Sequence, residues 1–369
     1  MVFPAFSGTL RETFVNKRWP NFENVSDLRI VDASALPSTY PSDTGCLKER
    51  IYARVRPDLS RIEGEINRLL STDIPLISVV GRHIMGSGGK RLRPLLMVLA
   101  ARLCGYTGQN DASLAVVFEF LHAATLLHDD VVDHAELRRN RPAANTVWGN
   151  PAAVLVGDFL YSKAIMMAVA YRNIRILEVL TEATTKMAEG EVLQLIHSGD
   201  LELDDREYLE VITRKTAIII SAACQVGAIF GGGSTEQEDA LKKYGLHLGI
   251  AFQLVDDTLD FTGDAEELGK PVGNDIQEGK ATLPLIRALR SACPEDRLRL
   301  QQIFSSEEVS PAEVSEVRNI VIRTHGIEHT LGLAATHSSL AREALRVFPD
   351  SPLKELLDDM AGYVVERRT

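Results

Sequence analysis

The chain has 369 residues, of which 45% are hydrophobic and 25% charged, a profile typical of a globular protein rather than a disordered or fibrous one. Its formal net charge of −11 argues against a nucleic-acid-binding protein that works through global basic charge, so an anionic ligand must be bound by local basic clusters. The four cysteines are far apart and form no CxxC pair, which suggests neither a disulfide framework nor a zinc site.

The N-terminal 46 residues contain four prolines and no sustained hydrophobic period, so we expect an irregular or disordered arm over residues 1–46. The first 50 residues hold six basic and six acidic side chains, whereas a mitochondrial presequence is basic and poor in acids. We therefore expect no targeting role for this arm and a cytoplasmic location for the protein.

From residue 47 to residue 369, apolar residues recur at helical spacing in successive segments, and strand-like alternation is nearly absent. Several segments, such as 113–127, are apolar almost all round and should lie in the middle of a bundle. The pattern predicts an all-α protein with a single large helical bundle. The expected helices include residues 59–70, 94–103, 113–132, 151–170, 174–197, 205–230, 236–261, 284–291 and 311–347.

The longest uncharged run, residues 216–234, is long enough to be weighed as a membrane span. It ends in three glycines and carries Ser221 and Gln225. We therefore favour a buried core helix and expect no membrane span.

The acidic pattern DDxxD occurs twice, each time directly after an apolar run: the first aspartate cluster is residues 129–133 and the second is residues 256–260. Because residues i and i+4 share a helix face, Asp129 should point with Asp133, and Asp256 with Asp260. Like-charged carboxylates at this spacing repel each other, and Mg²⁺ would offset them because it binds carboxylates together with substrate phosphates. We predict several Mg²⁺ ions here, with a solvated acidic face as the alternative for either copy alone.

Residues 74–110 contain no acidic side chain but six basic ones, which makes a local positive patch. At its centre a glycine-rich loop precedes a helix expected to begin at Pro94, and backbone N–H groups of such loops can approach a phosphate. It is not a Walker A loop, because Arg91 rather than Ser or Thr follows Lys90 and no strand precedes it. A plain flexible turn is the alternative.

Further basic and polar residues stand near the two aspartate clusters. Arg138 and Arg139 follow Asp133 by five and six positions, and their guanidinium groups suit bidentate phosphate contacts. Taken singly, three lysines would more often be solvated surface groups: Lys215, Lys270 and Lys280. Thr216 follows Lys215 directly, and Gln253 is one turn before Asp257, where its amide could equally face the surface or the site.

Together these residues resemble the trans-isoprenyl diphosphate synthases, over about residues 50–369. The family's hallmarks are a GGKxxRP loop, a DDxxD followed by an arginine pair, a KT dipeptide, an FQxxDDxxD motif and a GKxxxxD stretch with a further lysine. They stand here, in the family's order, at residues 88–94, 129–139, 215–216, 252–260 and 269–280. Within the family, the chain looks closest to bacterial octaprenyl and related long-chain synthases.

The resemblance implies two diphosphate sites. Mg²⁺ on an allylic diphosphate, such as farnesyl diphosphate, would be ligated by Asp129, Asp133 and Asp256, with Asp130, Asp257 and Asp260 as ligands or supporting partners. The same diphosphate would contact Arg138, Lys215, Thr216, Gln253, Lys270 and Lys280. Isopentenyl diphosphate would bind in a separate basic pocket made of Lys90, Arg93, His122 and Arg139. The implied catalytic set is Asp129, Asp130, Asp133, Lys215, Asp256 and Asp257.

The implied reaction is ionisation of the allylic C–O bond, attack by the isopentenyl double bond and loss of a proton to the released diphosphate. The protein would then act through positioning and electrostatics rather than through a nucleophile. The family also implies a homodimer.

Product length is expected to depend on the helix that carries the first aspartate cluster. Short-chain members place bulky aromatic residues four and five positions before its first Asp, where this chain has Thr125 and Ala124. Small side chains there would let a growing chain pass between helices, so we expect products of about C35 to C50, with C40 as the first estimate.

Three alternatives stay open. The first is a farnesyl or geranylgeranyl diphosphate synthase with a shorter product. The second is a class I terpene cyclase, although such cyclases usually lack the GGKxxRP loop and the second DDxxD. The third is a non-catalytic partner subunit, although such subunits tend to lose aspartates that are all present here.

Overall fold

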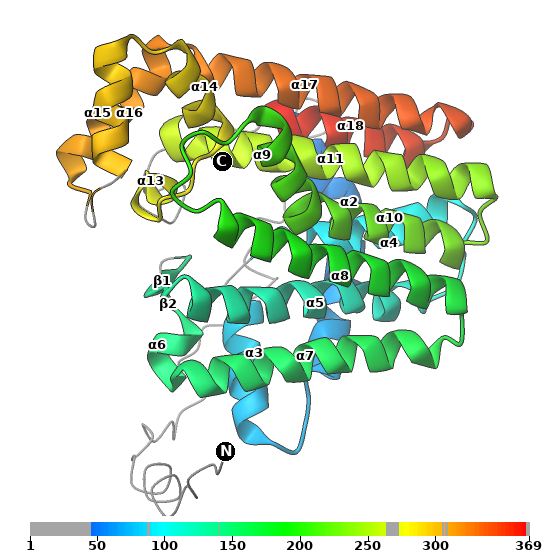
Figure 1. Ribbon diagram of the computed structural model, residues 1–369. Coiled ribbons are helices and arrows are strands. Elements are labelled where there is room, and N and C mark those ends of the chain that lie inside the picture. Colours follow the sequence, from blue (N-terminus) through cyan, green and yellow to red (C-terminus); the bar gives the residue numbers. More distant parts are fainter. Residues whose placement is uncertain are drawn as a thin grey trace, which may run out of the picture. The chain divides into compact units, whose positions relative to one another are not determined.

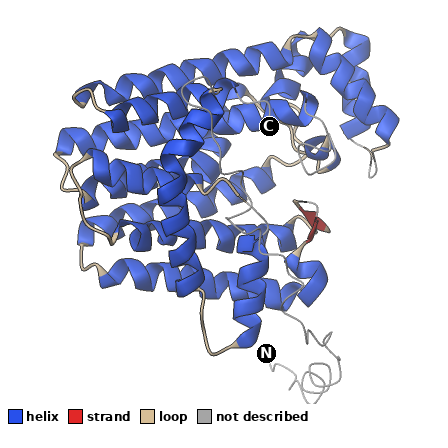
Figure 2. Cartoon of the chain, turned by 180° about the vertical axis from the view of Figure 1, so that it is seen from behind, coloured by secondary structure: helices blue, strands red, loops and turns tan. Residues whose placement is uncertain are grey.

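The computed structural model describes residues 46–86, 89–139, 141–262, 273–304, 306 and 309–366 (Figure 1). The predicted arm, residues 1–46, lies outside this part except for Cys46. The all-α expectation is confirmed, because the described chain is mostly helical and its only strands form one short hairpin, seen in Figure 2. In that hairpin β1 (Leu137–Arg138) pairs antiparallel with β2 (Arg141–Pro142).

The first half of the bundle contains the helices that carry the first aspartate cluster and its neighbours: α2 (Leu47–Leu69), α3 (Pro75–Gly86), α4 (Leu92–Leu103), α5 (Asp111–Val132), α6 (Ala144–Trp148), α7 (Asn150–Ala170) and α8 (Ile174–Ile196). Helix α5 packs on α4 and α7, and most of its residues are buried. It is the central helix that the nearly continuous apolar sequence predicts.

The second half begins with α9 (Asp205–Ile212), a π-helical turn at Thr213–Ala217, α10 (Ile218–Phe230) and α11 (Thr235–Thr262). It continues with α13 (Asn274–Gln277), α14 (Leu283–Ser291), α15 (Pro294–Phe304), α16 (Pro311–Arg323), α17 (Gly326–Ala344), a 3₁₀ turn at Leu345–Val347 and α18 (Pro352–Glu366). Helix α10 approaches α4 closely, because a Cβ atom at Gly227 would lie 2.5 Å from the carbonyl oxygen of Met97. Glycine is needed where two backbones come this close.

Four expected helices differ from the structure. The first, expected over residues 59–70, is the second half of α2, which begins at Leu47. The segment 205–230 is helical throughout, but a π-helical turn at Thr213–Ala217 interrupts the α-helical pattern between α9 and α10. The segment 311–347 is broken between α16 and α17, where His325 adopts a left-handed φ of 59°. Helix α4 begins at Leu92 rather than at Pro94. Proline is accommodated inside the first turn because N–H groups there have no partner within the helix.

Two described helices are long and apolar enough to cross a membrane by length and composition: Asn150–Ala170 and Asp205–Phe230. The second is 67% buried within the protein, which agrees with the core helix expected for residues 216–234. The first is 33% buried and leaves an apolar face uncovered.

Candidate active site

The two aspartate clusters lie at the carboxyl-terminal ends of α5 and α11, which Figure 1 shows at the same end of the bundle, near the hairpin and α13. Asp129 is half-buried and Asp133 caps α5 at the surface, while Asp130 is fully buried. In the second cluster Asp256 is half-buried, whereas Asp257 and Asp260 are buried. In each cluster, therefore, part of the carboxylate set faces the protein interior.

Three of the predicted cations lie on the first aspartate cluster. Arg138 of β1 donates from Nη2 to Asp130 Oδ1 at 2.6 Å. Lys280 Nζ lies 3.2 Å from Asp133 Oδ2, and Lys215 Nζ lies 4.0 Å from Asp129 Oδ2. Lys280 follows the second aspartate cluster in sequence, so its contact with Asp133 joins the two halves of the site.

Asp129 remains undercompensated in spite of Lys215. Burial raises the pKa of Asp129 to about 6; Lys215 opposes the shift, whereas Glu191 and Asp133 add to it. Glu191 also accepts a hydrogen bond from Lys215 Nζ at 2.7 Å and so competes for the same cation. An additional positive charge beside Asp129 would stabilise its ionised form.

No group of three or more His, Cys, Asp or Glu side chains that would hold a metal ion by itself occurs among the described residues. Mg²⁺ rarely needs such a cage, because it keeps several waters and commonly binds one or two carboxylates with substrate phosphates. The buried Oδ2 atom of Asp130 accepts no hydrogen bond from the part of the chain that the structure describes. Together with the raised pKa of Asp129, these carboxylate oxygens fit a divalent cation that arrives with an anionic ligand.

Asp257 is held inside the protein by two hydrogen bonds. The Tyr208 hydroxyl of α9 donates to one carboxylate oxygen, and Gln253 Nε2 donates to the other at 2.8 Å. Burial raises the pKa of Asp257 well above its usual range, and the neighbouring Asp275 raises it further. Asp257 therefore supports α11 from within, and Asp256 is the more accessible carboxylate of this pair. Tyr208 was not predicted from sequence, because a tyrosine in an amphipathic helix reads as a core position.

Asp260 ties α11 to the segment that follows the second cluster. Its Oδ2 atom accepts a hydrogen bond from the backbone N–H of Asp275 at 3.1 Å. Its carbonyl oxygen accepts one from the N–H of Gly273 at 3.0 Å. Lys280 lies on this anchored segment, whereas Lys270 falls outside the described residues.

The predicted basic pocket is assembled around His122 of α5. Burial lowers the pKa of His122 well below its usual value, and the positive charges of Arg93 and Arg139 lower it further. A Cβ atom at Gly89 would lie 3.1 Å from Arg139 Nη1, so Gly89 lies close to that guanidinium. The structure thus brings Arg93, His122 and Arg139 together, with exposed Lys90 on the same loop.

Lys215 and Thr216 are positioned by the π-helical turn. Such turns add one residue to a helical turn and are frequent at functional sites. Gly190 of α8 makes room for it, because a Cβ atom there would lie 2.6 Å from the backbone nitrogen of Lys215. The neighbouring Arg214 forms ion pairs with Glu189 and Glu210.

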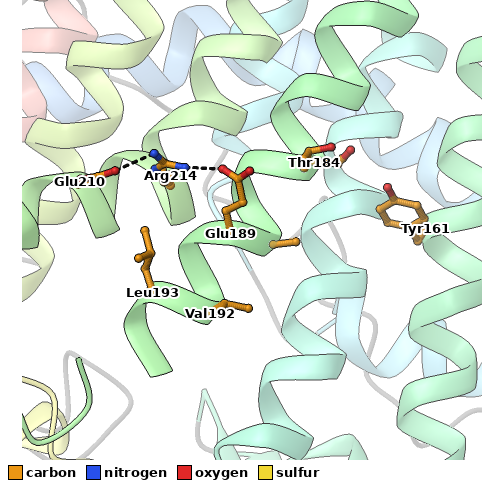
Figure 3. Close-up of a pocket in the computed structure, with 9 residues that line it drawn as sticks. Tyr161, Thr184, Glu189, Val192, Leu193, Glu210 and Arg214 are labelled. Atoms are coloured by element: carbon orange, nitrogen blue, oxygen red, sulfur yellow. Dashed lines mark hydrogen bonds and ion pairs between the residues drawn. The ribbon is translucent and has the colours of Figure 1, made fainter. Parts of the chain in front are cut away.

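A surface hollow of about 730 Å³ lies beside this turn, with Arg214 in its lining (Figure 3). It is lined by Tyr161 of α7, by α8 side chains from Thr184 to Leu193, and by Glu210 and Arg214. In Figure 3 the Arg214 guanidinium lies between the carboxylates of Glu189 and Glu210. None of the predicted site residues lines this hollow, so the hollow is not part of the predicted site at the aspartate clusters.

The two residues expected to govern product length are both on α5. Ala124 is buried in the main core, and Thr125 is half-buried with its hydroxyl donating to the His122 carbonyl oxygen at 2.9 Å. Thr125 is four residues before Asp129 and therefore shares its helix face.

Comparison with known proteins gives one consistent family. Residues 74–321 match the family described as Polyprenyl synthetase. The chain is 41% identical to the octaprenyl diphosphate synthase of Escherichia coli, over 86% of this chain and 98% of that protein. It is 39% identical to the short chain isoprenyl diphosphate synthase of Methanothermobacter thermautotrophicus, over 77% of this chain and 88% of that one.

The fold matches solved structures of the same family. A polyprenyl synthase from Caulobacter crescentus, crystallised with calcium and isoprenyl diphosphate, superimposes with a TM-score of 0.84. It is 40% identical in sequence, and the match covers 89% of this chain and 100% of that one.

Proposed function

The chain belongs to the polyprenyl synthetase family and is a prenyltransferase, and from this premise we propose that it condenses isopentenyl diphosphate with an allylic diphosphate such as farnesyl diphosphate. One observation carries the proposal. Arg138, Lys215 and Lys280 gather on the first aspartate cluster, while a second set of cations surrounds His122. Two separate anion sites on one helix suit a reaction that joins two diphosphate esters.

The allylic diphosphate is proposed to bind at the aspartate clusters with Mg²⁺ held by Asp129, Asp133 and Asp256. Bound there, Mg²⁺ would neutralise the diphosphate and favour ionisation of the allylic C–O bond. Arg138, Lys215 and Lys280 now pair with carboxylates, and each would turn toward diphosphate oxygens once a metal ion neutralises those carboxylates. Thr216, Gln253 and Lys270 complete the proposed contacts.

Isopentenyl diphosphate is proposed to bind in the basic pocket of Lys90, Arg93, His122 and Arg139. The low pKa of the His122 imidazole keeps the ring neutral, so it can donate one hydrogen bond to the diphosphate without adding charge. The two substrates would then approach from neighbouring positions on α5, because His122 lies two turns before Asp129.

We propose a long-chain product of about C35 to C50, with C40 first. Overall identity does not separate product lengths, since the octaprenyl and short-chain relatives are 41% and 39% identical. The support comes from α5, where Ala124 and Thr125 leave the turn directly below Asp129 free of aromatic side chains.

A second copy of the chain is proposed to cover α7 and α8 as a homodimer. Both helices present apolar side chains to solvent at helical spacing, which a monomer rarely does over a continuous face. They are Val154, Leu155, Tyr161, Met166, Val169, Ile174, Val192, Leu195 and Ile196. In sedimentation experiments we expect the wild type to be a dimer and Leu155→Asp to be a monomer. A monomeric wild type would contradict the proposal.

A cytoplasmic location stays a prediction.

The activity is tested by incubating the purified protein with farnesyl and isopentenyl diphosphates and Mg²⁺, then separating the dephosphorylated products by chromatography. We expect prenyl alcohols longer than C15 in five-carbon steps, and none when a chelator is present. A cyclised hydrocarbon would indicate a terpene cyclase. No turnover by the protein alone would indicate a partner subunit.

A further inference from the structure

Arg91 lies between two residues of the basic pocket loop, yet its own side chain points into the protein. Its backbone has a left-handed φ of 44° just before α4, and it is 8% exposed. The guanidinium donates to Glu119 Oε1 at 2.5 Å, to Glu63 Oε1 at 2.6 Å and to the Met85 carbonyl oxygen at 2.7 Å. These three contacts fasten the loop to α5, α2 and α3.

The contacts offset an unfavourable backbone. A left-handed conformation is unfavourable for a residue with a Cβ atom, so it persists only where the surroundings impose it. The turn at Arg91 sends its side chain inward and leaves Lys90 exposed on one side and Arg93 half-buried beside His122 on the other. Without the inward contacts, the loop has no reason to keep this conformation.

Glu119 provides the negative charge that such a pocket needs before any ligand arrives. It is 6% exposed and lies one helical turn before His122 on α5. Burial lowers the pKa of Arg93 and the charge of Glu119 opposes that shift. Burial also disfavours the charged form of Arg91, but Glu119 and Glu63 raise its pKa overall. Removing one partner of a buried pair would leave an uncompensated charge.

We infer that Arg91, held by Glu119 and Glu63, is a positioning residue for isopentenyl diphosphate: it fixes the loop so that Lys90 and Arg93 face the diphosphate. The inference rests on the proposed function and adds residues that do not touch the substrate. The donors of Arg91 are directed to Glu63, Glu119 and Met85, so none is available for the ligand in this arrangement.

The test compares Glu119→Gln and Arg91→Lys with Asp111→Asn. Asp111 is a matched control, because it is a fully buried carboxylate on the same helix, paired with Arg61 and Arg102. For Glu119→Gln and Arg91→Lys we expect the KM for isopentenyl diphosphate to rise about tenfold or more, the size of one displaced charged contact. The KM for farnesyl diphosphate should change less than about threefold. Asp111→Asn should lower the melting temperature without this split.

A binding measurement keeps the inference testable if a variant folds poorly. Calorimetric titration of isopentenyl diphosphate without divalent metal reports on the basic pocket, because the aspartate clusters require a cation. The milder Glu63→Gln, on a half-exposed side chain, should weaken this binding while retaining the wild-type melting temperature within a few degrees.

The outcomes separate the two proposals. An unchanged KM and binding constant in Glu119→Gln and Arg91→Lys, with an active wild type, would overturn the positioning role alone. An equal KM shift in Asp111→Asn would show that the effect comes from lower stability in general, and it would also overturn the positioning role. A wild type that neither turns over nor binds isopentenyl diphosphate would overturn the proposed function and this inference with it.

Discussion

The surroundings of Asp129 indicate that it belongs to a cation-binding site. It is half-buried, close to two other carboxylates, Glu191 and Asp133, and only partly offset by Lys215 at 4.0 Å. A buried carboxylate in such surroundings is unfavourable in the ligand-free protein and gains from an added cation. A strained charge of this kind is typical of a binding site rather than of a structural one.

Replacing Asp129 by Asn should therefore reduce turnover far more than stability. We expect kcat to fall by about a hundredfold or more, because one oxygen of the proposed metal site becomes an amide. Steady-state kinetics with Mg²⁺ measures the effect. Asp350→Asn serves as the control, since Asp350 is fully exposed and far from the site in sequence. A kcat within threefold of wild type would exclude a role for Asp129 in the reaction.

The residues below Asp129 should set product length. Introducing Phe at Thr125, which shares the helix face of Asp129, should shorten the main product by several five-carbon units, since an aromatic ring would block the path of the growing chain. Ala124→Phe should act in the same direction but also lower stability by about 1–3 kcal/mol, because Ala124 is packed in the core. Chromatography of the products measures their chain length. An unchanged product length in both variants would refute the role of Thr125 and Ala124 in setting it.

At the level of elements, the π-helical turn between α9 and α10 is the feature that orients Lys215. The turn fits only because α8 has no side chain at Gly190. Lys215 and Arg214 are adjacent in sequence yet pair with different acids, Glu191 for Lys215 and Glu189 with Glu210 for Arg214. The π-helical turn between α9 and α10 thus determines that Lys215, rather than Arg214, lies beside the aspartate clusters.

Gly190→Ala should displace this turn. The added Cβ atom would meet the Lys215 backbone, so we expect a loss of about 1–3 kcal/mol in the free energy of unfolding together with a reduced kcat. The matched control is Gly332→Ala in α17, where an added Cβ atom meets nothing within 4 Å. That change should be neutral or stabilise by up to about 1 kcal/mol through helix propensity. Equal behaviour of the two variants in denaturant unfolding would contradict the account.

The packing of α11 against α17 predicts a pH dependence of stability. His247 and His337 lie with their Nδ1 atoms 3.0 Å apart, and burial together with the neighbouring histidine lowers the pKa of His337 to about 4. The unfolded chain then binds the proton more readily, so this contribution is complete above about pH 6.5 and is lost as the pH falls toward 4.

Urea unfolding at pH 7.5 and pH 5 measures this effect. Wild type should lose up to about 2 kcal/mol over that range through His337, and His337→Gln should lose correspondingly less. A steeper loss in His337→Gln than in wild type would show that the sign is wrong.

On the scale of the whole molecule, local patterns in the sequence predicted the bundle well. The helix over residues 113–132 and the positions of Asp129, Asp133 and Arg138 follow from spacing and apolar runs, and the structure has α5 at Asp111–Val132. Spacing also places both aspartate clusters at helix ends. Such features depend on residues that are neighbours in sequence or on one helix face.

Long-range partners were not predictable in this way. Arg91 reads as one more cation of a basic patch, and its inward turn depends on Glu119 and Glu63, each 28 residues away in sequence. The hydrophobic period does not reveal an added residue in a helical turn, so it could not predict the π-helical turn at Thr213–Ala217. Nor does DDxxD spacing tell which carboxylate points inward, as Asp257 does toward Tyr208.

The central claim is that one chain joins two diphosphate esters, and the stoichiometry of the reaction tests it most directly. With purified protein, Mg²⁺, farnesyl diphosphate and labelled isopentenyl diphosphate, released diphosphate and incorporated label are measured in the same quenched samples. We predict one diphosphate released for each isopentenyl unit incorporated, and none when isopentenyl diphosphate is left out. Diphosphate release from farnesyl diphosphate alone, without incorporation of label, would contradict the account.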